Sequence, residues 1–247
     1  MSGHVIPFTV GRMGNFLFQA AAAIGYARKH GLEFSLPAKA QPPRYDPVYL
    51  PHLAKPVDPG LHAVIIEEEV FHYHELPFKE EWRDGNIMLQ GYWQSEKYFA
   101  GLRQEILNLF AFKWQSKPGV VSVHVRRTDY LRWKNKHPRV PVEWIRHAMS
   151  QFPGYRFEFY SDDIEWCVQT FGKRKDSSFS RGKNEVEDLE SMSGCDHHIC
   201  SASTFSWWGA WLNRNPHKRV IMPKLWFVPG WGGHDTRDIV PPEWEKL

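Results

Sequence analysis

The sequence has few cysteines and no long apolar segment, and each shortage argues against a class of protein. Its three cysteines, Cys167, Cys195 and Cys200, are odd in number and show no Cys-x-x-Cys spacing, which disfavours a disulfide framework and a thiolate zinc site. No stretch approaches the ~18 apolar residues of a membrane span. The N-terminus lacks the basic segment and uninterrupted apolar run of a signal peptide. We expect a soluble cytoplasmic protein, unless an N-terminal anchor was removed.

An excess of charge is also missing. Lys and Arg number 31 against 28 Asp and Glu, a formal net charge of +3. Together with the acidic run at 67–69, this small excess argues against nucleic acid as a partner.

Aromatic residues, in contrast, are abundant. They make up 15% of the 247 residues and include 12 Trp and 9 Tyr. Such rings pack in cores, and Trp and Tyr also suit the flat faces of sugars or bases. With 42% hydrophobic and 24% charged residues, the composition is that of a globular protein large enough for one big domain or two small lobes.

The first half of the chain opens with a strand, a glycine turn and a helix. Residues 4–10 are apolar, residues 11–14 contain two glycines, and residues 15–30 include four consecutive alanines before Gly31. This order is typical of the start of a βαβ unit. Further along, the pattern predicts strands at 64–66 and 87–89, an amphipathic helix at 95–112, and a long surface excursion at 37–60, where there are seven prolines.

The second half alternates strands and helices more regularly. The near-continuous apolar run at 119–125 is typical of a buried parallel strand. Sheets of this kind bind ligands at the carboxyl ends of their strands, which is where the polar clusters of this sequence fall. We predict an α/β fold of two halves with a seam near 113–118, further strands at 155–160, 198–200 and 220–222, and helices at 141–152, 184–195 and 204–213.

The densest polar cluster follows the 119–125 strand. Strand alternation places His124 and Arg126 on one face and Arg127 on the other. A guanidinium at a strand end, partly shielded from water, suits bidentate contact with phosphate oxygens. The alternative is an Arg–Asp ion pair that only ties down a loop.

Two more clusters follow later strands. Ser203 or Thr204 is a natural N-cap for the 204–213 helix, whose free N–H groups form a ready anion site, although this cluster taken alone favours an ordinary capped helix with its Trp pair in the core. Asp162 and Asp163 could accept hydrogen bonds from a purine or bind a divalent metal, or could simply form an Asx turn and helix cap.

The fourth cluster is the glycine turn at 11–15. It lacks the Gly-Lys-Ser/Thr of a P-loop and the three-glycine spacing of a dinucleotide-binding motif. It predicts a tight turn that brings the backbone and the Asn15 amide close to a ligand.

Taken together, the four clusters are more specific than any one of them. The segments Gly11–Gln19, His124–Tyr130, Phe159–Trp166 and Ser203–Ala210 occur in one order. They resemble the motif set of the inverting α-1,2-fucosyltransferases, glycosyltransferase family eleven. The resemblance spans nearly the whole chain and is poorest at 37–85.

The resemblance implies a GT-B-like architecture of two Rossmann-like lobes. Residues 1–115 would form the acceptor-side lobe with the glycine loop, and residues 116–247 the GDP-sugar-binding lobe. It implies transfer of L-fucose from GDP-fucose, with inversion, to the 2-hydroxyl of a galactose-terminated glycan, without a metal or other cofactor.

The resemblance also implies roles for individual residues. Arg126 contacts the donor phosphates, the turn at 203–206 holds the pyrophosphate, His124 and one of the two aspartates lie near guanine, and Asn15 lies near the reacting centre. The residues expected to bind the donor are Gly14, Asn15, His124, Arg126, Asp162, Asp163, Ser203, Thr204, Phe205 and Ser206.

Catalysis without a metal needs a fixed cation and oriented N–H donors where charge develops on the leaving diphosphate. Arg126 supplies the cation, and Asp129 is the nearest motif carboxylate for a base. With Asn15, which the resemblance alone places at the reacting centre, these are the expected catalytic residues. Two other classes stay open. One is a metal-dependent transferase that uses Asp162 and Asp163, and the other is a non-catalytic carbohydrate-binding protein that uses its Trp side chains.

Overall fold

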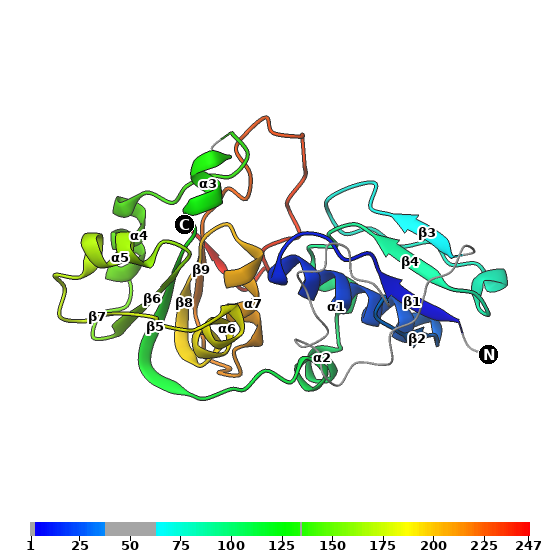
Figure 1. The fold of residues 1–247 in the computed structure, drawn as a ribbon, viewed down its shortest axis with the longest axis horizontal. Helices are drawn as coiled ribbons and strands as arrows, with labels where there is room; N and C mark the ends of the chain where they lie inside the picture. Colours follow the sequence, from blue (N-terminus) through cyan, green and yellow to red (C-terminus); the bar gives the residue numbers. More distant parts are fainter. Residues whose placement is uncertain (1–2, 38–62, 134) are drawn as a thin grey trace. The chain divides into compact units, whose positions relative to one another are not determined.

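The computed structural model describes residues 3–37, 63–133 and 135–247. The chain divides into two compact units (Figure 1): unit 1 comprises Met1–Phe112 with His234–Pro241, and unit 2 comprises Lys113–Gly233 with Pro242–Leu247. The surface excursion predicted at 37–60 lies, beyond Pro37, outside the described residues. Across the described part, no helix is both long and apolar enough to pass through a membrane.

Unit 1 contains a four-stranded parallel sheet in the order β2-β1-β4-β3. The predicted strands at the start of the chain and near residues 64 and 87 are all present, each four residues long. Parallel pairing requires crossovers between the strands, which is the βαβ arrangement that the opening of the sequence predicts. The bounds are β1 (His4–Pro7), β2 (Glu33–Phe34), β3 (Val64–Glu67) and β4 (Ile87–Gln90).

Helix α1 (Met13–His30) is buried along most of its length. Its alanines let neighbouring segments approach closely, and a Cβ atom on Gly25 would lie only 2.0 Å from the Tyr98 carbonyl oxygen. The helix ends where Gly31 adopts a left-handed conformation with φ of 65°. α1 begins two residues earlier than the sequence predicts.

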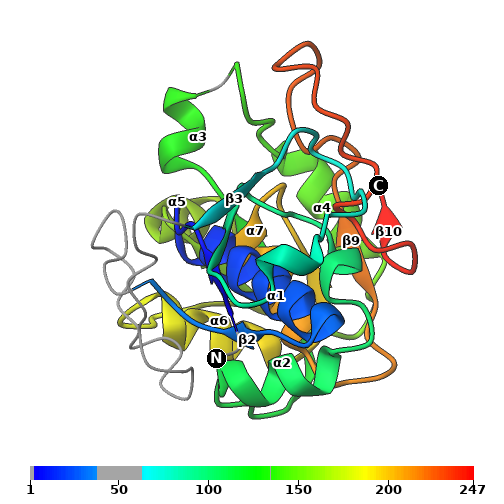
Figure 2. The same cartoon turned by 90° about the vertical axis from the view of Figure 1, so that its right-hand side faces the viewer.

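The prediction of a single helix at 95–112 is wrong. The structure has two short helices there, η3 (Glu96–Phe99) and α2 (Arg103–Phe110), and a further short helix, η2 (Glu80–Trp82), earlier in the unit. Gly101 separates η3 from α2 with φ of 78°, which a continuous helix does not allow. α2 lies beside α1 (Figure 2), and a 2.6 Å ion pair joins Arg28 to Glu105.

Unit 2 is built on a six-stranded sheet in the order β10-β9-β8-β5-β6-β7, with every pair parallel. The central strand β5 is the longest, and its residues from Val120 to Val125 are buried. A strand buried on both faces reads as an apolar run, which is why the sequence predicted it. The bounds are β5 (Lys117–Val125), β6 (Arg156–Ser161), β7 (Ser177–Phe179), β8 (Cys195–Ile199), β9 (Val220–Met222) and β10 (Glu245–Lys246).

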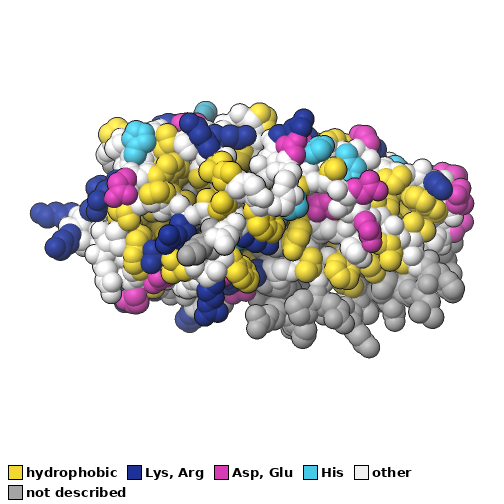
Figure 3. Space-filling view, turned by 90° about the horizontal axis from the view of Figure 1, so that it is seen from above, with side chains coloured by type: hydrophobic (Ala, Val, Ile, Leu, Met, Phe, Trp, Pro, Cys, Tyr) yellow, Lys and Arg dark blue, Asp and Glu magenta, His cyan; other side chains and the backbone are white. Residues whose placement is uncertain are grey.

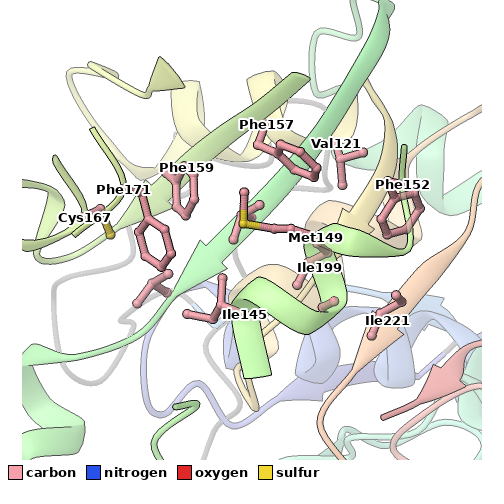
Figure 4. Close-up of a cluster of buried hydrophobic side chains, with 13 residues drawn as sticks. Val121, Ile145, Met149, Phe152, Phe157, Phe159, Cys167, Phe171, Ile199 and Ile221 are labelled. Carbon is pink, nitrogen blue, oxygen red and sulfur yellow. The ribbon is translucent and has the colours of Figure 1, made fainter. Parts of the chain in front are cut away.

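Helices cover both faces of this sheet. On one face, Ile145 and Met149 of α4 and Phe171 of α5 pack on Phe157 and Phe159 of β6 (Figure 4). On the other face, Met192 of α6 packs on Tyr160, and α7 buries Trp207, Trp208 and Trp211. Much of the aromatic content therefore serves the core. The helices are α3 (Thr128–Arg132), α4 (Val142–Ser150), α5 (Ile164–Phe171), α6 (Glu185–Ser193) and α7 (Thr204–Leu212).

Candidate functional site

Three neighbouring strands of unit 2 end at the same edge of the sheet. Val125 at the end of β5 lies opposite Ser161 at the end of β6, and Val123 lies opposite Ile199 at the end of β8. The residues that follow these strands are therefore brought together, as the sequence predicts for a parallel sheet.

Arg126 follows β5 directly and is held from two sides. Its Nε and Nη2 donate hydrogen bonds to the two carboxylate oxygens of Asp129, at 2.8 and 2.6 Å, and its Nε lies 3.3 Å from Asp162 Oδ2. The side chain is 10% exposed. Burial acts to lower the pKa of Arg126, but the Asp129 hydrogen bonds and the Asp162 charge outweigh it and raise the pKa. The structure thus holds a fixed, permanently charged guanidinium at the strand end.

Asp162 anchors the loop that carries Arg126. One carboxylate oxygen accepts the backbone N–H of Arg127 at 2.9 Å, and the other accepts both the N–H and the hydroxyl of Thr128. A carboxylate that accepts several hydrogen bonds fixes the backbone around it. Asp162, one of the two aspartates of which the resemblance places one near guanine, is thus the loop's main support.

Arg127 and Asp163 form a separate pair directed at α5. The Arg127 Nε donates to Asp163 Oδ2 at 3.0 Å, and the guanidinium lies 3.9 Å from the centre of the Trp166 ring. Asp163 also accepts the Trp166 N–H and thereby caps α5. Adjacent arginines therefore have different partners: Arg126 faces the Asp129–Asp162 side and Arg127 packs on the helix.

The turn before α7 is the third part of the edge. Ser203 is the N-cap residue of α7, but its side chain makes no capping hydrogen bond. Ser206 is fully buried, and its hydroxyl donates to the carbonyls of Ser201 and Ser203. These hydrogen bonds hold the backbone of the turn in place. The first-turn N–H groups of α7, with Thr204 and Phe205 beside them, lie where the sequence predicts an anion site.

Side chains connect the β5 end to this turn. His124 Nδ1 and Ser201 Oγ lie 2.6 Å apart, and the rings of His124 and Phe205 are separated by 5.5 Å. The hydroxyl of Tyr130 donates to the Ala202 carbonyl at 2.5 Å, and its ring centre lies 5.9 Å from the Arg126 guanidinium. Arg126 and the α7 turn therefore belong to one rigid assembly.

His137 supports this assembly, and sequence reasoning missed it. Its ring stacks on Tyr130 with centroids 4.2 Å apart and planes at 8°. Phe227 and Trp231 flank the same ring. Burial, together with the charge of Lys136, lowers the pKa of His137 to about 4. The ring is therefore neutral at physiological pH.

This stack predicts an acid-sensitive contribution to stability. The folded pKa of His137 lies below the unfolded value, so the unfolded chain binds a proton first as the pH falls from about 6.5 to about 4. The contribution of the neutral His137 ring to the stability of the fold is complete above about pH 6.5 and is lost as the pH falls towards about 4. We expect the Tm to fall between about pH 7 and about pH 5 by several degrees more in the wild type than in His137→Phe, which keeps the stack. His147→Phe, at an exposed position on α4, is the control and should match the wild type.

The glycine loop and Asn15 lie in unit 1. Gly14 and Asn15 are in the first turn of α1, and the Asn15 Oδ1 accepts a 3.0 Å hydrogen bond from Gln94 Nε2. Gly11 has φ of 89°, and a Cβ atom there would meet the Asn15 amide nitrogen at 2.3 Å. The glycine therefore allows Asn15 to fold back over the turn, as a tight loop requires.

Three residues that the sequence analysis did not identify, Glu68, Trp93 and Gln94, hold the glycine loop and Asn15 in place. Trp93, fully buried, has φ of 53°, an unusual conformation for a bulky residue. It persists because the Glu68 carboxylate accepts the N–H groups of Tyr92 and Trp93 at 2.7 and 2.8 Å. Burial raises the pKa of Glu68, against the lowering effect of those two donors. The strained conformation of Trp93 places the next residue, Gln94, within hydrogen-bond distance of Asn15. The sequence alone does not predict this contact.

The predicted residues thus fall into two groups. His124, Arg126, Asp129, Asp162, Asp163 and the 203–206 turn come together in unit 2, whereas Gly14 and Asn15 belong to unit 1. Asp129 has both oxygens engaged by Arg126. In this arrangement it orients the guanidinium, and it would have to release it before acting as a base.

Comparison with known proteins gives relatives of matching sequence and fold. The chain is 31% identical over 165 residues to an α-1,2-colitosyltransferase of Escherichia coli, covering 58% of this chain and 57% of the relative. It is 28% identical over 297 aligned positions to human galactoside α-(1,2)-fucosyltransferase 1, covering 98% of this chain and 77% of the relative. The chain spans about half the length of the first curated relatives that it matches.

The fold has a solved counterpart in the E. coli heptosyltransferase WaaC, with a TM-score of 0.56 at 11% identity, over 99% of this chain and 92% of that one. The predicted α/β, GT-B-like architecture is confirmed. The model of one family, glycosyl transferase family 11, matches residues 65–245, which include the β5 end, the Asp162–Asp163 pair and the α7 turn. The chain belongs to glycosyl transferase family 11.

Proposed function

We propose that the protein transfers L-fucose from GDP-fucose, with inversion, to the 2-hydroxyl of a galactose-terminated glycan. The observation that carries the proposal is the shielded Arg126 guanidinium at the carboxyl end of β5, which Tyr130 connects to the turn before α7. The names of two relatives, an α-1,2-colitosyltransferase and a galactoside α-(1,2)-fucosyltransferase, share the 1,2 linkage and support it.

The chemistry requires positive charge where the leaving diphosphate becomes more negative. Breaking the bond between fucose C1 and the diphosphate gives an oxocarbenium-like sugar and leaves charge on the β-phosphate. Arg126 and the first-turn N–H groups of α7 supply a cation and a dipole end that need no reorganisation. An acceptor hydroxyl then attacks from the opposite face and gives its proton to a base.

The charge of unit 2 suits an anionic donor. Its sequence holds 20 Lys and Arg against 14 Asp and Glu, an excess of 20 − 14 = +6. Lys and Arg side chains are spread over its surface in Figure 3, where they are dark blue. On this proposal the pyrophosphate lies at Arg126 and the 203–206 turn, and guanine lies near His124 and the Asp162–Asp163 pair.

The metal-dependent alternative uses the same two aspartates differently. Asp162 and Asp163 have their oxygens engaged by arginines and N–H groups, and within the described residues no three His, Cys, Asp or Glu side chains gather in a metal-binding group. A carboxylate neutralised by guanidinium is a poor match for a divalent cation. The donor set therefore favours direct stabilisation by Arg126.

The experiment offers GDP-fucose, GDP-colitose and ADP-linked sugars with a panel of β-galactosides, and determines the product linkage by NMR. We expect α-1,2-fucosylated product, selectivity for GDP over ADP donors, and activity that survives excess EDTA. GDP-colitose is included because a colitosyltransferase is among the relatives.

Each alternative has its own signature in the same assay. Loss of transfer on adding EDTA would favour the metal-dependent enzyme. Glycan binding without tight, salt-sensitive GDP binding would favour a carbohydrate-binding protein. Absence of transfer and of GDP release with every nucleotide sugar would refute the enzyme.

A further inference from the structure

Unit 1 contains a pocket that the chemistry at Arg126 does not use. It has a volume of about 60 Å³ and lies between α1, the segment at 73–76, and η3. Its walls include Tyr26, Lys29, Tyr73, Glu75, Lys97 and Tyr98. These six side chains combine aromatic faces with hydroxyl, ammonium and carboxylate groups.

The aromatic walls are held in place by hydrogen bonds at their polar ends. Tyr26 donates to the Pro77 carbonyl at 2.6 Å, and Tyr73 donates to Glu75 at 2.8 Å. The rings of Tyr73 and Tyr98 lie 4.9 Å apart at 58° to each other. Rigid rings with a polar rim lose little conformational entropy when a ligand stacks on them.

The charges around the pocket are balanced. Lys29 is paired with Glu75, and Lys97 with Asp238. Asp238 also accepts the Tyr73 N–H at 3.1 Å, which ties the 234–241 segment to this wall. The wall itself carries two ammonium groups, one carboxylate and two imidazoles, and each ammonium is neutralised by a paired carboxylate, that of Lys97 by Asp238 beside the pocket. Paired charges of this kind favour a neutral ligand that both donates and accepts hydrogen bonds, rather than a phosphate or another anion.

The pocket has room for one sugar residue. A cavity of about 60 Å³ has room for roughly four to six waters, which occupy about 120–180 Å³ as liquid. That is the size of a single pyranose. Hydroxyl groups can replace these waters while the apolar face of the ring stacks on a tyrosine.

The pocket lies along the same face of α1 as Asn15. On α1, the wall positions Ala22, Tyr26 and Lys29 lie 7, 11 and 14 residues after Asn15, spacings that place all four on one face of the helix. Gln94, which binds Asn15, is followed directly by η3, whose Lys97 and Tyr98 line the pocket. These wall positions lie roughly 10–21 Å along the helix axis from Asn15, farther than the sugar at the reacting centre extends.

We propose that this pocket is a distal subsite, which binds a neutral sugar residue of the acceptor glycan remote from the galactose that receives fucose. The inference rests on the proposed function, because it assigns the acceptor to unit 1. Its consequence is specificity for chain length: an oligosaccharide fills the pocket, and a simple galactoside leaves it empty.

The test compares methyl β-galactoside with a galactose-terminated tetrasaccharide. For the wild type we expect a higher kcat/KM with the tetrasaccharide. Tyr73→Ala, Lys29→Ala and Lys97→Ala should each lower that value about five- to tenfold through the acceptor KM, the size of one lost stacking or polar contact. The kcat/KM for methyl β-galactoside and the hydrolysis of GDP-fucose without acceptor should not change.

Two controls separate binding from folding. Arg28 is next to Lys29 in the chain, but it pairs with Glu105 and does not line the pocket. Arg28→Ala should therefore keep the wild-type preference for the tetrasaccharide. Tyr73→Phe keeps the ring and removes the hydroxyl, so it should keep most of the preference if stacking dominates. All variants are compared by circular dichroism.

The outcomes also separate this inference from the proposed function. If the wild type transfers fucose and the pocket variants treat both acceptors alike, the subsite is refuted and the function stands. If no fucose is transferred, saturation-transfer NMR with the tetrasaccharide still decides. Signals that disappear in Tyr73→Ala support the subsite, and unchanged or absent signals refute it.

Discussion

Replacing Arg126 by alanine is expected to lower kcat by about 10²–10³, or ~3–4 kcal/mol of transition-state stabilisation, as the loss of one preorganised charge-stabilising donor does. The guanidinium is 10% exposed and is oriented by Asp129 before any donor binds. Its interaction grows as the diphosphate leaves, so kcat should fall more than the donor KM rises. Steady-state kinetics with GDP-fucose and a β-galactoside measure both.

The adjacent arginine provides the matched control. Arg127 packs on Trp166 and pairs with Asp163, so Arg127→Ala should lower the Tm but change kcat by less than about tenfold. Arg126→Lys should recover only part of the activity, because an ammonium cannot reproduce the planar fork of a guanidinium. A folded Arg126→Ala protein with wild-type kcat would overturn the proposed mechanism.

The sequence was most informative where one periodicity dominates. The predicted strand at 220–222 matches β9, and the 204–213 helix matches α7 to within one residue, because short apolar strands and a capped apolar helix carry unambiguous signals. The position of the polar clusters could be predicted for the same reason: they follow strands of a parallel sheet.

Strand β8 shows why the beginning of a buried strand can be missed. The sequence predicted a helix to 195 and a strand at 198–200, whereas β8 spans Cys195–Ile199. Its polar residues hide the strand pattern, and tertiary hydrogen bonds satisfy them. His198 lies 2.7 Å from Ser122 Oγ and 2.6 Å from Asn213 Nδ2, and burial lowers its pKa well below the usual value. No local rule predicts partners so far apart in the chain.

In the candidate site, too, contacts between residues close in the sequence could be predicted, and contacts between distant residues could not. The Arg126–Asp129 pair spans three residues and was weighed from the sequence as an ion pair, whereas the support from Asp162 comes from the neighbouring strand. Both readings of Arg126 are compatible, since an ion pair that ties down the loop is also what orients the guanidinium. Glu68 and Gln94 could not be predicted, because their contacts with Trp93 and Asn15 exist only after the sheet of unit 1 forms.

Asp162→Ala is expected to have the largest effect on stability, about 3 kcal/mol. The side chain is 13% exposed, and its removal leaves Arg126 with one fewer partner and two backbone N–H groups without their acceptor. For a chain of this size, that corresponds to a Tm lower by roughly 6–12 °C. Because the loop positions Arg126, and because guanine is assigned nearby, the donor KM should also rise. Thermal unfolding and donor kinetics test the two effects.

Asp163→Ala is the matched control for Asp162→Ala, since it removes a neighbouring carboxylate that has different contacts. It should cost about 1 kcal/mol, the usual loss for an N-cap, and leave the Arg126 loop in place. Asp162→Asn keeps the shape and one acceptor for the Arg127 N–H, so its Tm should lie between those of the wild type and Asp162→Ala. Equal Tm values for the two alanine variants would show that Asp162 does not hold the loop. Unchanged donor KM in both would remove the aspartate pair from donor binding.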